Sequence, residues 1–274
     1  MTTPVLERFY QRLIKTPMNL DTRNRLGSLL AAEVRHEQSE QWQSIVSRSD
    51  SLLDPLRRLQ NDGCLTLQIP YAQALAQELR ALPHRGQGQR GPGGRTETED
   101  LEHVNALPSV QKLIQDQSLH ALVSLYLGAP AYLHSCQAWW QYPMGSEHKA
   151  SNAQQWHRDR DDLAELKLFF YATDVDASSG PHGFVPGSHT AEGLRRIFPS
   201  TSDIDPVVNG TEHIFIDDNI LIQRGLKGAI KTWIGPAGSC FLEDTRGFHR
   251  AYIPTEQPRL LFSLVWTLGV GFQR

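Results

Sequence analysis

The sequence predicts a β-barrel or β-sandwich with helices packed around it. Apolar residues recur at helical spacing over residues 4–60, whereas short runs rich in β-branched and aromatic residues follow one another from Tyr132 onward. Clusters rich in Gly and Pro separate these later runs, and no internal repeat is visible. Short strands divided by such turns are typical of a barrel or a sandwich, so we expect helices around a C-terminal β core.

The first third of the chain is expected to be mostly helical. Asp54 followed by Pro55 is typical of an N-cap and a first-turn proline, and predicts that a helix begins there. The sequence Asn61-Asp62-Gly63 is expected to end this helix. The elements expected next are a strand over residues 64–69 and helices over residues 72–82 and 110–127.

Residues 83–96 interrupt this pattern with five glycines and three arginines, a composition that cannot pack a core. A basic lid over an anionic substrate and a solvated surface loop are both open for this loop. Beyond it, strands are expected over residues 132–142, 166–173, 213–216, 229–234, 239–242 and 259–268.

The bulk properties favour one globular domain over residues 1–274, with a helical extension at 1–60 and a β-barrel core at 132–274. A net charge of −3 gives no footprint for nucleic acid, and no apolar run is long enough to cross a membrane. The three cysteines are widely spaced, so we expect reduced thiols and a cytoplasmic protein. The sequence gives no oligomeric state.

A possible metal site stands out at His157 and Asp159. Side chains two residues apart on a strand point to the same face, and His249 could supply a third ligand from another strand. Two imidazoles and one carboxylate on one face of an octahedral ion suit non-heme Fe(II). From spacing alone the pair could also be a surface hydrogen-bonding pair, and His182 and His189 are rival third ligands.

Arg259 opens the apolar run Arg-Leu-Leu-Phe-Ser-Leu-Val-Trp, where a guanidinium needs an anion. It could bind the distal carboxylate of an oxo-acid whose other end chelates the metal, because guanidinium and carboxylate pair bidentately. A surface salt bridge is the alternative.

From about Leu59 to the C-terminus, the chain resembles the phytanoyl-CoA dioxygenase family of Fe(II)/2-oxoglutarate-dependent oxygenases. The motifs that carry the resemblance are Gln-Trp-His157-Arg-Asp159, the run from Leu166 to Asp176, Gly-Pro-His-Gly-Phe-Val-Pro-Gly-Ser-His189, and Phe-His249-Arg-Ala with Arg259.

This resemblance implies a double-stranded β-helix (a jelly-roll, cupin-like barrel) with flanking N-terminal helices. It implies His157, Asp159 and His249 as catalytic iron ligands, with His182 and His189 outside the ligand set. It also implies that Arg259, Gln137 and Phe169 contact 2-oxoglutarate.

The function implied is a dioxygenase that uses Fe(II), 2-oxoglutarate and O2, with ascorbate as reductant in vitro, to hydroxylate an unactivated C–H bond of a small molecule. Succinate and CO2 are the products of the cosubstrate. A zinc-dependent cupin-like hydrolase or isomerase and a non-catalytic barrel are the alternatives. No motif in the sequence selects the substrate.

Overall fold

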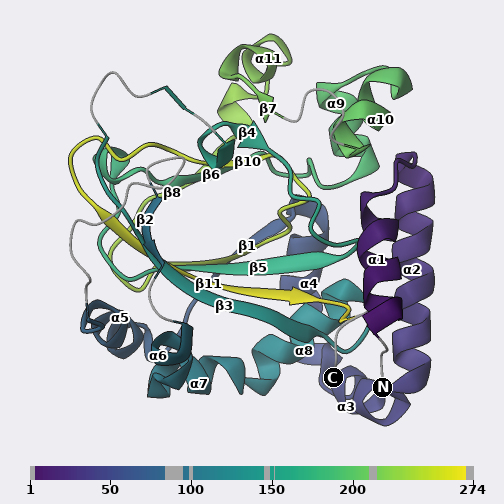
Figure 1. Cartoon of the computed structure of the whole chain (residues 1–274), viewed down its shortest axis with the longest axis horizontal. Helices are drawn as coiled ribbons and strands as arrows, with labels where there is room; N and C mark the ends of the chain where they lie inside the picture. Colours follow the sequence, from purple (N-terminus) through teal and green to yellow (C-terminus); the bar gives the residue numbers. More distant parts are fainter. Residues whose placement is uncertain are drawn as a thin grey trace.

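The computed structural model describes residues 4–83, 95–98, 101–144, 149–150, 152–209 and 215–269. Two antiparallel sheets face each other and helices lie around them (Figure 1). The larger sheet has the order β1-β9-β5-β11-β3-β2 and the smaller has the order β7-β4-β10-β6-β8. The predicted double-stranded β-helix with flanking N-terminal helices is confirmed.

The strands are β1 (Cys64–Leu67), β2 (Arg95–Thr98), β3 (Tyr132–Gln141), β4 (Trp156–His157), β5 (Glu165–Tyr171), β6 (His182–Phe184), β7 (Phe215–Ile216), β8 (Lys231–Trp233), β9 (Cys240–Glu243), β10 (His249–Ala251) and β11 (Arg259–Thr267). The helices are α1 (Pro4–Lys15), α2 (Leu20–Glu37), α3 (Ser39–Val46), α4 (Leu53–Asp62), α5 (Ala72–Arg80), α6 (Leu101–Ala106), α7 (Pro108–Ile114), α8 (Gln117–Leu127), α9 (Ala191–Ile197), α10 (Thr201–Asn209) and α11 (Asp218–Gln223).

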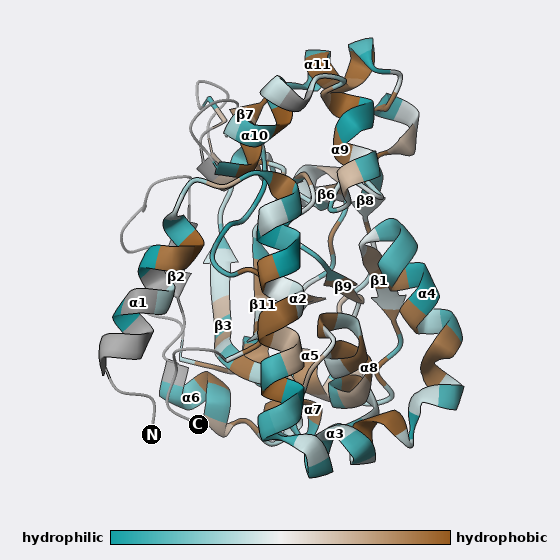
Figure 2. Ribbon diagram, turned by 90° about the vertical axis from the view of Figure 1, so that its right-hand side faces the viewer, coloured by the Kyte–Doolittle hydropathy of each residue, from teal (hydrophilic) through white to brown (hydrophobic). Residues whose placement is uncertain are grey.

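One face of the larger sheet packs against helices, and the other lines the interior of the barrel. Side chains alternate along a strand, so every second residue of β5 and β11 points to the same face. On one face Leu168, Phe170 and Phe262 are buried in a core that includes residues of α4, α5, α7 and α8. The helices show both hydrophobic and hydrophilic residues along their length, as expected for helices with one buried side (Figure 2). The other face of the sheet is free to line the interior of the barrel.

Several local expectations are corrected by the structure. Helix α4 begins at Leu53 after a short 3₁₀ turn and has no side-chain cap, so Asp54 lies in its first turn and is not its N-cap. The helix expected over residues 110–127 is two helices, because the Asp116 carboxylate accepts hydrogen bonds from the Ser118 and Leu119 amides and starts α8. Gly63 ends α4 in the left-handed conformation, as predicted.

The second half of the chain contains helices that the strand pattern did not predict. Helices α9, α10 and α11 lie beside the smaller sheet (Figure 1) and bury a cluster around Leu194, Val207 and Leu221. Residues 84–94 of the Gly- and Arg-rich loop, for which a basic lid and a solvated surface loop were both open, lie outside the described residues. Its last residues pair with β3 as strand β2.

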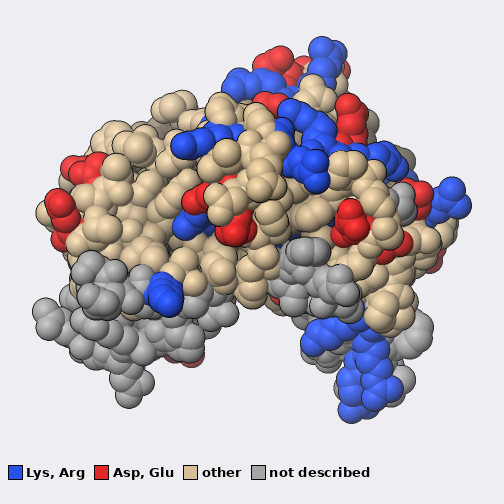
Figure 3. All heavy atoms as spheres, turned by 90° about the horizontal axis from the view of Figure 1, so that it is seen from above, with Lys and Arg blue, Asp and Glu red and all other residues tan. Residues whose placement is uncertain are grey.

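The remaining global properties concern charge, thiols and membrane contact. Acidic and basic side chains are interspersed on the face seen from above (Figure 3). The cysteines are all free, and Cys64 and Cys240 are buried. Among the described helices, none is both long and apolar enough to cross a membrane.

Candidate metal centre and cosubstrate pocket

A cavity of about 670 Å³ lies between the two sheets. Its floor is the inner face of the larger sheet, because the odd-numbered residues of three adjacent strands point into it. These floor residues are Ser135, Gln137, Trp139 and Gln141 of β3, Glu165, Lys167 and Phe169 of β5, and Arg259, Leu261, Ser263, Val265 and Thr267 of β11. His157, Asp159 and His249 line the same cavity.

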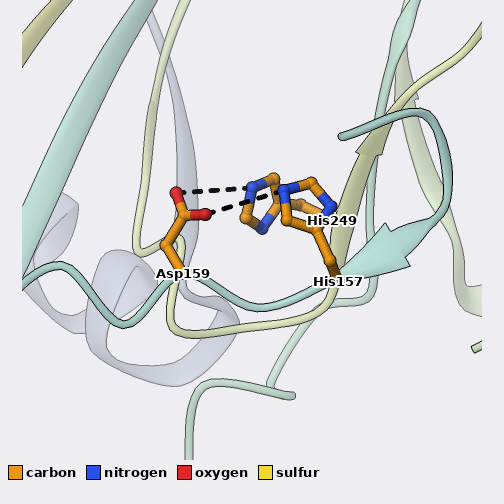
Figure 4. Close-up of side chains that lie close together, drawn as sticks. All are labelled: His157, Asp159 and His249. Carbon is orange, nitrogen blue, oxygen red and sulfur yellow. Dashed lines mark ion pairs between the residues drawn. The ribbon is translucent and has the colours of Figure 1, made fainter. Parts of the chain in front are cut away.

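The two histidines of the predicted triad are brought together by strand pairing. His249 in β10 is the direct partner of His157 in β4, and the centres of their rings are 4.1 Å apart. Asp159 follows β4 and turns its carboxylate toward both rings (Figure 4). His157 Nε2 is 3.6 Å from Asp159 Oδ1, and His249 Nε2 is 3.6 Å from Asp159 Oδ2. Residues far apart in the sequence therefore converge on one point.

Both imidazoles are held in the form that binds a metal through Nε2. His157 Nδ1 lies 2.9 Å from the Gln155 carbonyl oxygen, and His249 Nδ1 lies 3.0 Å from the Gly247 carbonyl oxygen. A carbonyl only accepts, so each Nδ1 carries the proton and each Nε2 keeps its lone pair. Burial, with the charge of His157, lowers the pKa of His249 well below its usual value, which also favours the neutral ring.

The geometry fits one metal ion. One ligand atom from each of the three residues lies within 4.8 Å of the others. Ligand atoms about 2.1 Å from a single octahedral ion lie about 3 Å from each other, so small side-chain adjustments would complete the site. Two neutral nitrogens and one carboxylate, without a thiolate, suit Fe(II) and leave one face of the ion open.

The Pro-Gly-Ser-His segment, residues 186–189, holds the backbone next to His249 in place. The Ser188 hydroxyl accepts a 2.7 Å hydrogen bond from the Phe248 amide, next to His249, and donates to the Val185 carbonyl. His189 Nε2 lies 3.0 Å from the Gln60 carbonyl oxygen, so His189 contacts the C-terminal end of α4. His189 does not join the three ligands, in line with the resemblance.

Lys167 forms an ion pair with Asp159. Its Nζ is 2.5 Å from Asp159 Oδ2 and 3.7 Å from Asp161 Oδ2. Burial alone would raise the pKa of Asp159, but Lys167, His249 and His157 together lower it below its usual range. The carboxylate is therefore ionised and available as a ligand. Lys167 therefore pairs with Asp159 and is not exposed at the surface.

Arg259 is fully buried at one end of the cavity. It donates hydrogen bonds to the Gly180 carbonyl and to Gln141 Oε1, and its Nε has no partner. Among the described residues no carboxylate lies within ion-pair distance of it, which excludes the surface salt bridge. Burial lowers the pKa of this guanidinium, although the neighbouring Tyr171 raises it. A buried cation without an anion is costly, so the arrangement favours an anionic ligand.

Gln137 and Phe169 lie on the cavity floor between the triad and Arg259. Phe169 pairs with Ser263, and Ser263 pairs with Gln137, so the three side chains form one row across the sheet. The ring of Phe169 lies 4.7 Å from that of His182. Both residues are thus placed where a molecule joining the metal site to Arg259 would contact them.

His182 lines the cavity without reaching the ligand cluster. Its Nε2 is 2.9 Å from Glu243 Oε1, and its ring stacks beside that of His249 at 5.7 Å. Burial raises the pKa of Glu243 well above its usual value, with Asp159 adding to the effect. His182 is therefore held by Glu243 as a wall of the site.

Sequence reasoning missed Gln141 and Glu243, because their partners are distant in the chain. Gln141 is the register partner of Arg259, a relation that only the pairing of β3 with β11 reveals. Arg158 and Arg246 are linked to each other and to a buried carboxylate. Arg158 donates to the Arg246 carbonyl, and Arg246 forms an ion pair with the buried Asp244.

No protein-family model and no curated protein matches the chain. Solved structures do match. EctD from S. alaskensis with bound Fe is 18% identical with a TM-score of 0.51, over 78% of this chain and 75% of EctD. The non-heme alpha-ketoglutarate-dependent epimerase SnoN from nogalamycin biosynthesis is 22% identical with a TM-score of 0.51, over 79% of this chain and 83% of SnoN. The chain therefore shares the fold of these two proteins, as its resemblance to the phytanoyl-CoA dioxygenase family implies.

Proposed function

We propose that the protein is an Fe(II)- and 2-oxoglutarate-dependent dioxygenase that hydroxylates a C–H bond of a small molecule. One observation carries this proposal: a single cavity holds three converging metal ligands and, along the same sheet, a buried guanidinium with no carboxylate partner among the described residues. A metal site alone would also suit hydrolysis. The unpaired cation at the cavity end favours a dicarboxylate cosubstrate.

In this proposal His157, Asp159 and His249 hold Fe(II), and Lys167 keeps Asp159 ionised. Arg259, fixed by Gln141 and the Gly180 carbonyl, binds the distal carboxylate of 2-oxoglutarate through its remaining N–H groups. When bound, the metal and cosubstrate supply the oxidation of a C–H bond by O2, with release of succinate and CO2.

The remaining residues shape the space around these two groups. Phe169 and Leu261 cover the stretch between the metal ligands and Arg259, while Gln137 offers an amide to the cosubstrate. The apolar side chains of Phe169 and Leu261 reduce contact with water next to Arg259, which strengthens the pairing of Arg259 with a carboxylate. The chain thus contributes binding and orientation.

The proposal is tested by anaerobic titration of 2-oxoglutarate into the protein with Fe(II) and ascorbate. We expect a weak visible metal-to-ligand band, which Asp159→Ala and His249→Ala abolish. Asp21→Ala, at an exposed position in α2, is the matched control and should keep the band. Retention of both the band and turnover in Asp159→Ala would exclude this ligand set.

Hydroxylation is tested separately, by measuring whether the product gains an oxygen atom. A screen of candidate metabolites should find one that stimulates succinate formation and gains one oxygen atom, which mass spectrometry measures. A stimulated reaction whose product has gained no oxygen would contradict hydroxylation but not 2-oxoglutarate dependence. Zinc retained through purification, with turnover independent of 2-oxoglutarate, would favour hydrolysis or isomerisation.

A further inference from the structure

The end of the cavity opposite Arg259 has a different chemical character. Strand β11 runs from Arg259 to Thr267, and Thr267 pairs with Glu165 at the start of β5 (Figure 1). Glu165 therefore lies on the far side of Lys167 from Phe169. If the cosubstrate occupies the Arg259 end, the substrate is left with this second end, which we call the outer end.

Glu165 is a buried carboxyl group with one oxygen left over. It is fully buried, lines the cavity, and lies on the inner face with Lys167 and Phe169. Its Oε1 accepts a 2.9 Å hydrogen bond from the Thr245 hydroxyl, whereas its Oε2 has no hydrogen-bond partner. An unpaired buried oxygen of this kind is costly, and a ligand that donates to it removes the cost.

The cation nearest in the sequence is already engaged. Lys167 binds Asp159 and lies near Asp161, and no ion pair joins it to Glu165 among the described residues. Burial raises the pKa of Glu165 to about 8, with Lys167 lowering it and Asp159 raising it. A second cation beside Oε2 would favour the ionised form and add a charge-assisted hydrogen bond.

The other charged groups of the outer end leave room for such a cation. Asp161 and Asp162 also line it, and the Asp162 Oδ1 atom accepts from the Tyr10 hydroxyl and from backbone amides. Two cations line it as well: Lys15 is exposed to solvent, and Arg160 donates to the Asn209 carbonyl. Within the described part of the chain neither forms an ion pair with Glu165. Arg23 and Arg246 act on Glu165 through their charge, and Oε2 has no hydrogen-bond partner.

Helix α1 gives this end a wall. Ile14 is buried in a small cluster with Tyr10 and Leu163, and Ile14 also lines the cavity. Arg23 of α2 donates to the Ile14 and Asp162 carbonyl oxygens, which joins the helices to the segment before β5. The N-terminal helices, whose role the sequence left open, thus enclose the space next to Glu165.

We propose that Glu165 is a substrate-binding residue and that its free oxygen binds a protonated amino group of the substrate. The substrate is accordingly a small molecule with a primary or secondary amine, its carbon chain pointing from Glu165 toward the metal ligands. This assignment rests on the proposed function, because it takes the Arg259 end as the place of the cosubstrate.

The test uses n-hexylammonium as a probe, with 1-hexanol and hexanoate as matched controls of the same chain length. Their dissociation constants are measured by ligand-observed NMR on the purified protein and on Glu165→Gln. We expect the amine to bind most tightly to the wild-type protein and about tenfold or more weakly to Glu165→Gln, with 1-hexanol unchanged. Glu78→Gln, a part-buried carboxyl that accepts from the Ser109 amide and hydroxyl and lies outside the cavity lining, should keep amine binding.

Each outcome decides the assignment. Equal binding of amine and alcohol to the wild-type protein overturns it, even if Glu165→Gln fails to fold. Amine binding that is unchanged in a folded Glu165→Gln also overturns it. The visible 2-oxoglutarate band is recorded on the same samples. Loss of the amine preference in Glu165→Gln, with the band retained, supports the role of Glu165. Absence of the band in the wild-type protein refutes the proposed function, and the amine measurements then decide on Glu165 by themselves.

Discussion

Replacement of Arg259 by methionine should remove the binding of 2-oxoglutarate while leaving the metal ligands in place. A guanidinium has five N–H groups. In this structure one is donated to the Gly180 carbonyl and one to Gln141 Oε1. Nε and one hydrogen on each terminal nitrogen remain, so Nε and a neighbouring nitrogen can bind a carboxylate side-on with two parallel hydrogen bonds.

The expected magnitude follows from these two bonds. A hydrogen bond to a charged group contributes about 1.5–3 kcal/mol, so two contribute about 3–6 kcal/mol. Loss of both in Arg259→Met should weaken 2-oxoglutarate binding by about two to four orders of magnitude. Arg259→Lys keeps the charge but not the planar fork, and should lose about half of this free energy.

The assay is anaerobic titration of 2-oxoglutarate with Fe(II), followed by the visible band or by calorimetry. Arg224→Met is a matched control, because Arg224 donates to the Ile197 carbonyl in the helical region beside the smaller sheet and does not line the cavity. Unchanged 2-oxoglutarate affinity in a folded Arg259→Met would show that the cosubstrate does not bind at this end. Equal affinities of Arg259→Lys and the wild-type protein would contradict the side-on geometry.

Two further predictions concern buried charges near the site. Lys167→Met leaves Asp159 without its closest cation, so chemical denaturation of the metal-free protein should show a free energy of unfolding that is lower by about 3 kcal/mol. Added Zn²⁺ or Fe²⁺ should restore part of this stability, because the metal would replace Lys167 as the cation beside Asp159. A loss that metal does not restore would contradict Asp159 as a metal ligand. For Asp244, burial would raise the pKa, but Arg246 lowers it from 3.8 to about 2, so its ionised form stabilises the folded state above about pH 4 and this contribution is lost as the pH falls toward 2. Asp244→Asn should remove roughly 2 kcal/mol of that pH-dependent stability, and an identical acid unfolding curve for both proteins would contradict it.

The main strands and the closeness of His157 and Asp159 were predictable from the sequence because both depend on local patterns. Runs rich in β-branched and aromatic residues indicated β5 and β11. The two-residue spacing of His157 and Asp159 brought both side chains to one point, although β4 ends at His157 and Asp159 follows it. His249 required the family resemblance, since spacing alone left His182 and His189 open. The structure adds the physical reason: β4 and β10 pair at His157 and His249, whereas His182 is held by Glu243.

The helices α9 to α11 and the helix boundaries near Asp54 and Asp116 were not predictable in the same way. These helices are short, and each buries its apolar residues against a distant part of the chain, such as Trp156 and Phe248. Tertiary packing of this kind overrides weak local preferences. Pairing partners such as Gln141 also depend on strand register, which no short sequence window contains.

Strand register also explains why the two ends of the cavity can bind different groups independently. Arg259 and Thr267 are the two ends of the nine-residue strand β11, and a strand rises about 3.4 Å per residue, so the two ends lie about 27 Å apart along the floor. At an effective dielectric constant of about 20, two unit charges about 27 Å apart interact by only about 0.6 kcal/mol. Substitution of Arg259 should therefore change affinity for the carboxylate cosubstrate with little effect on the amine probe, and substitution of Glu165 should do the reverse. Parallel losses of both affinities in either variant would show that the two ends are not separate sites.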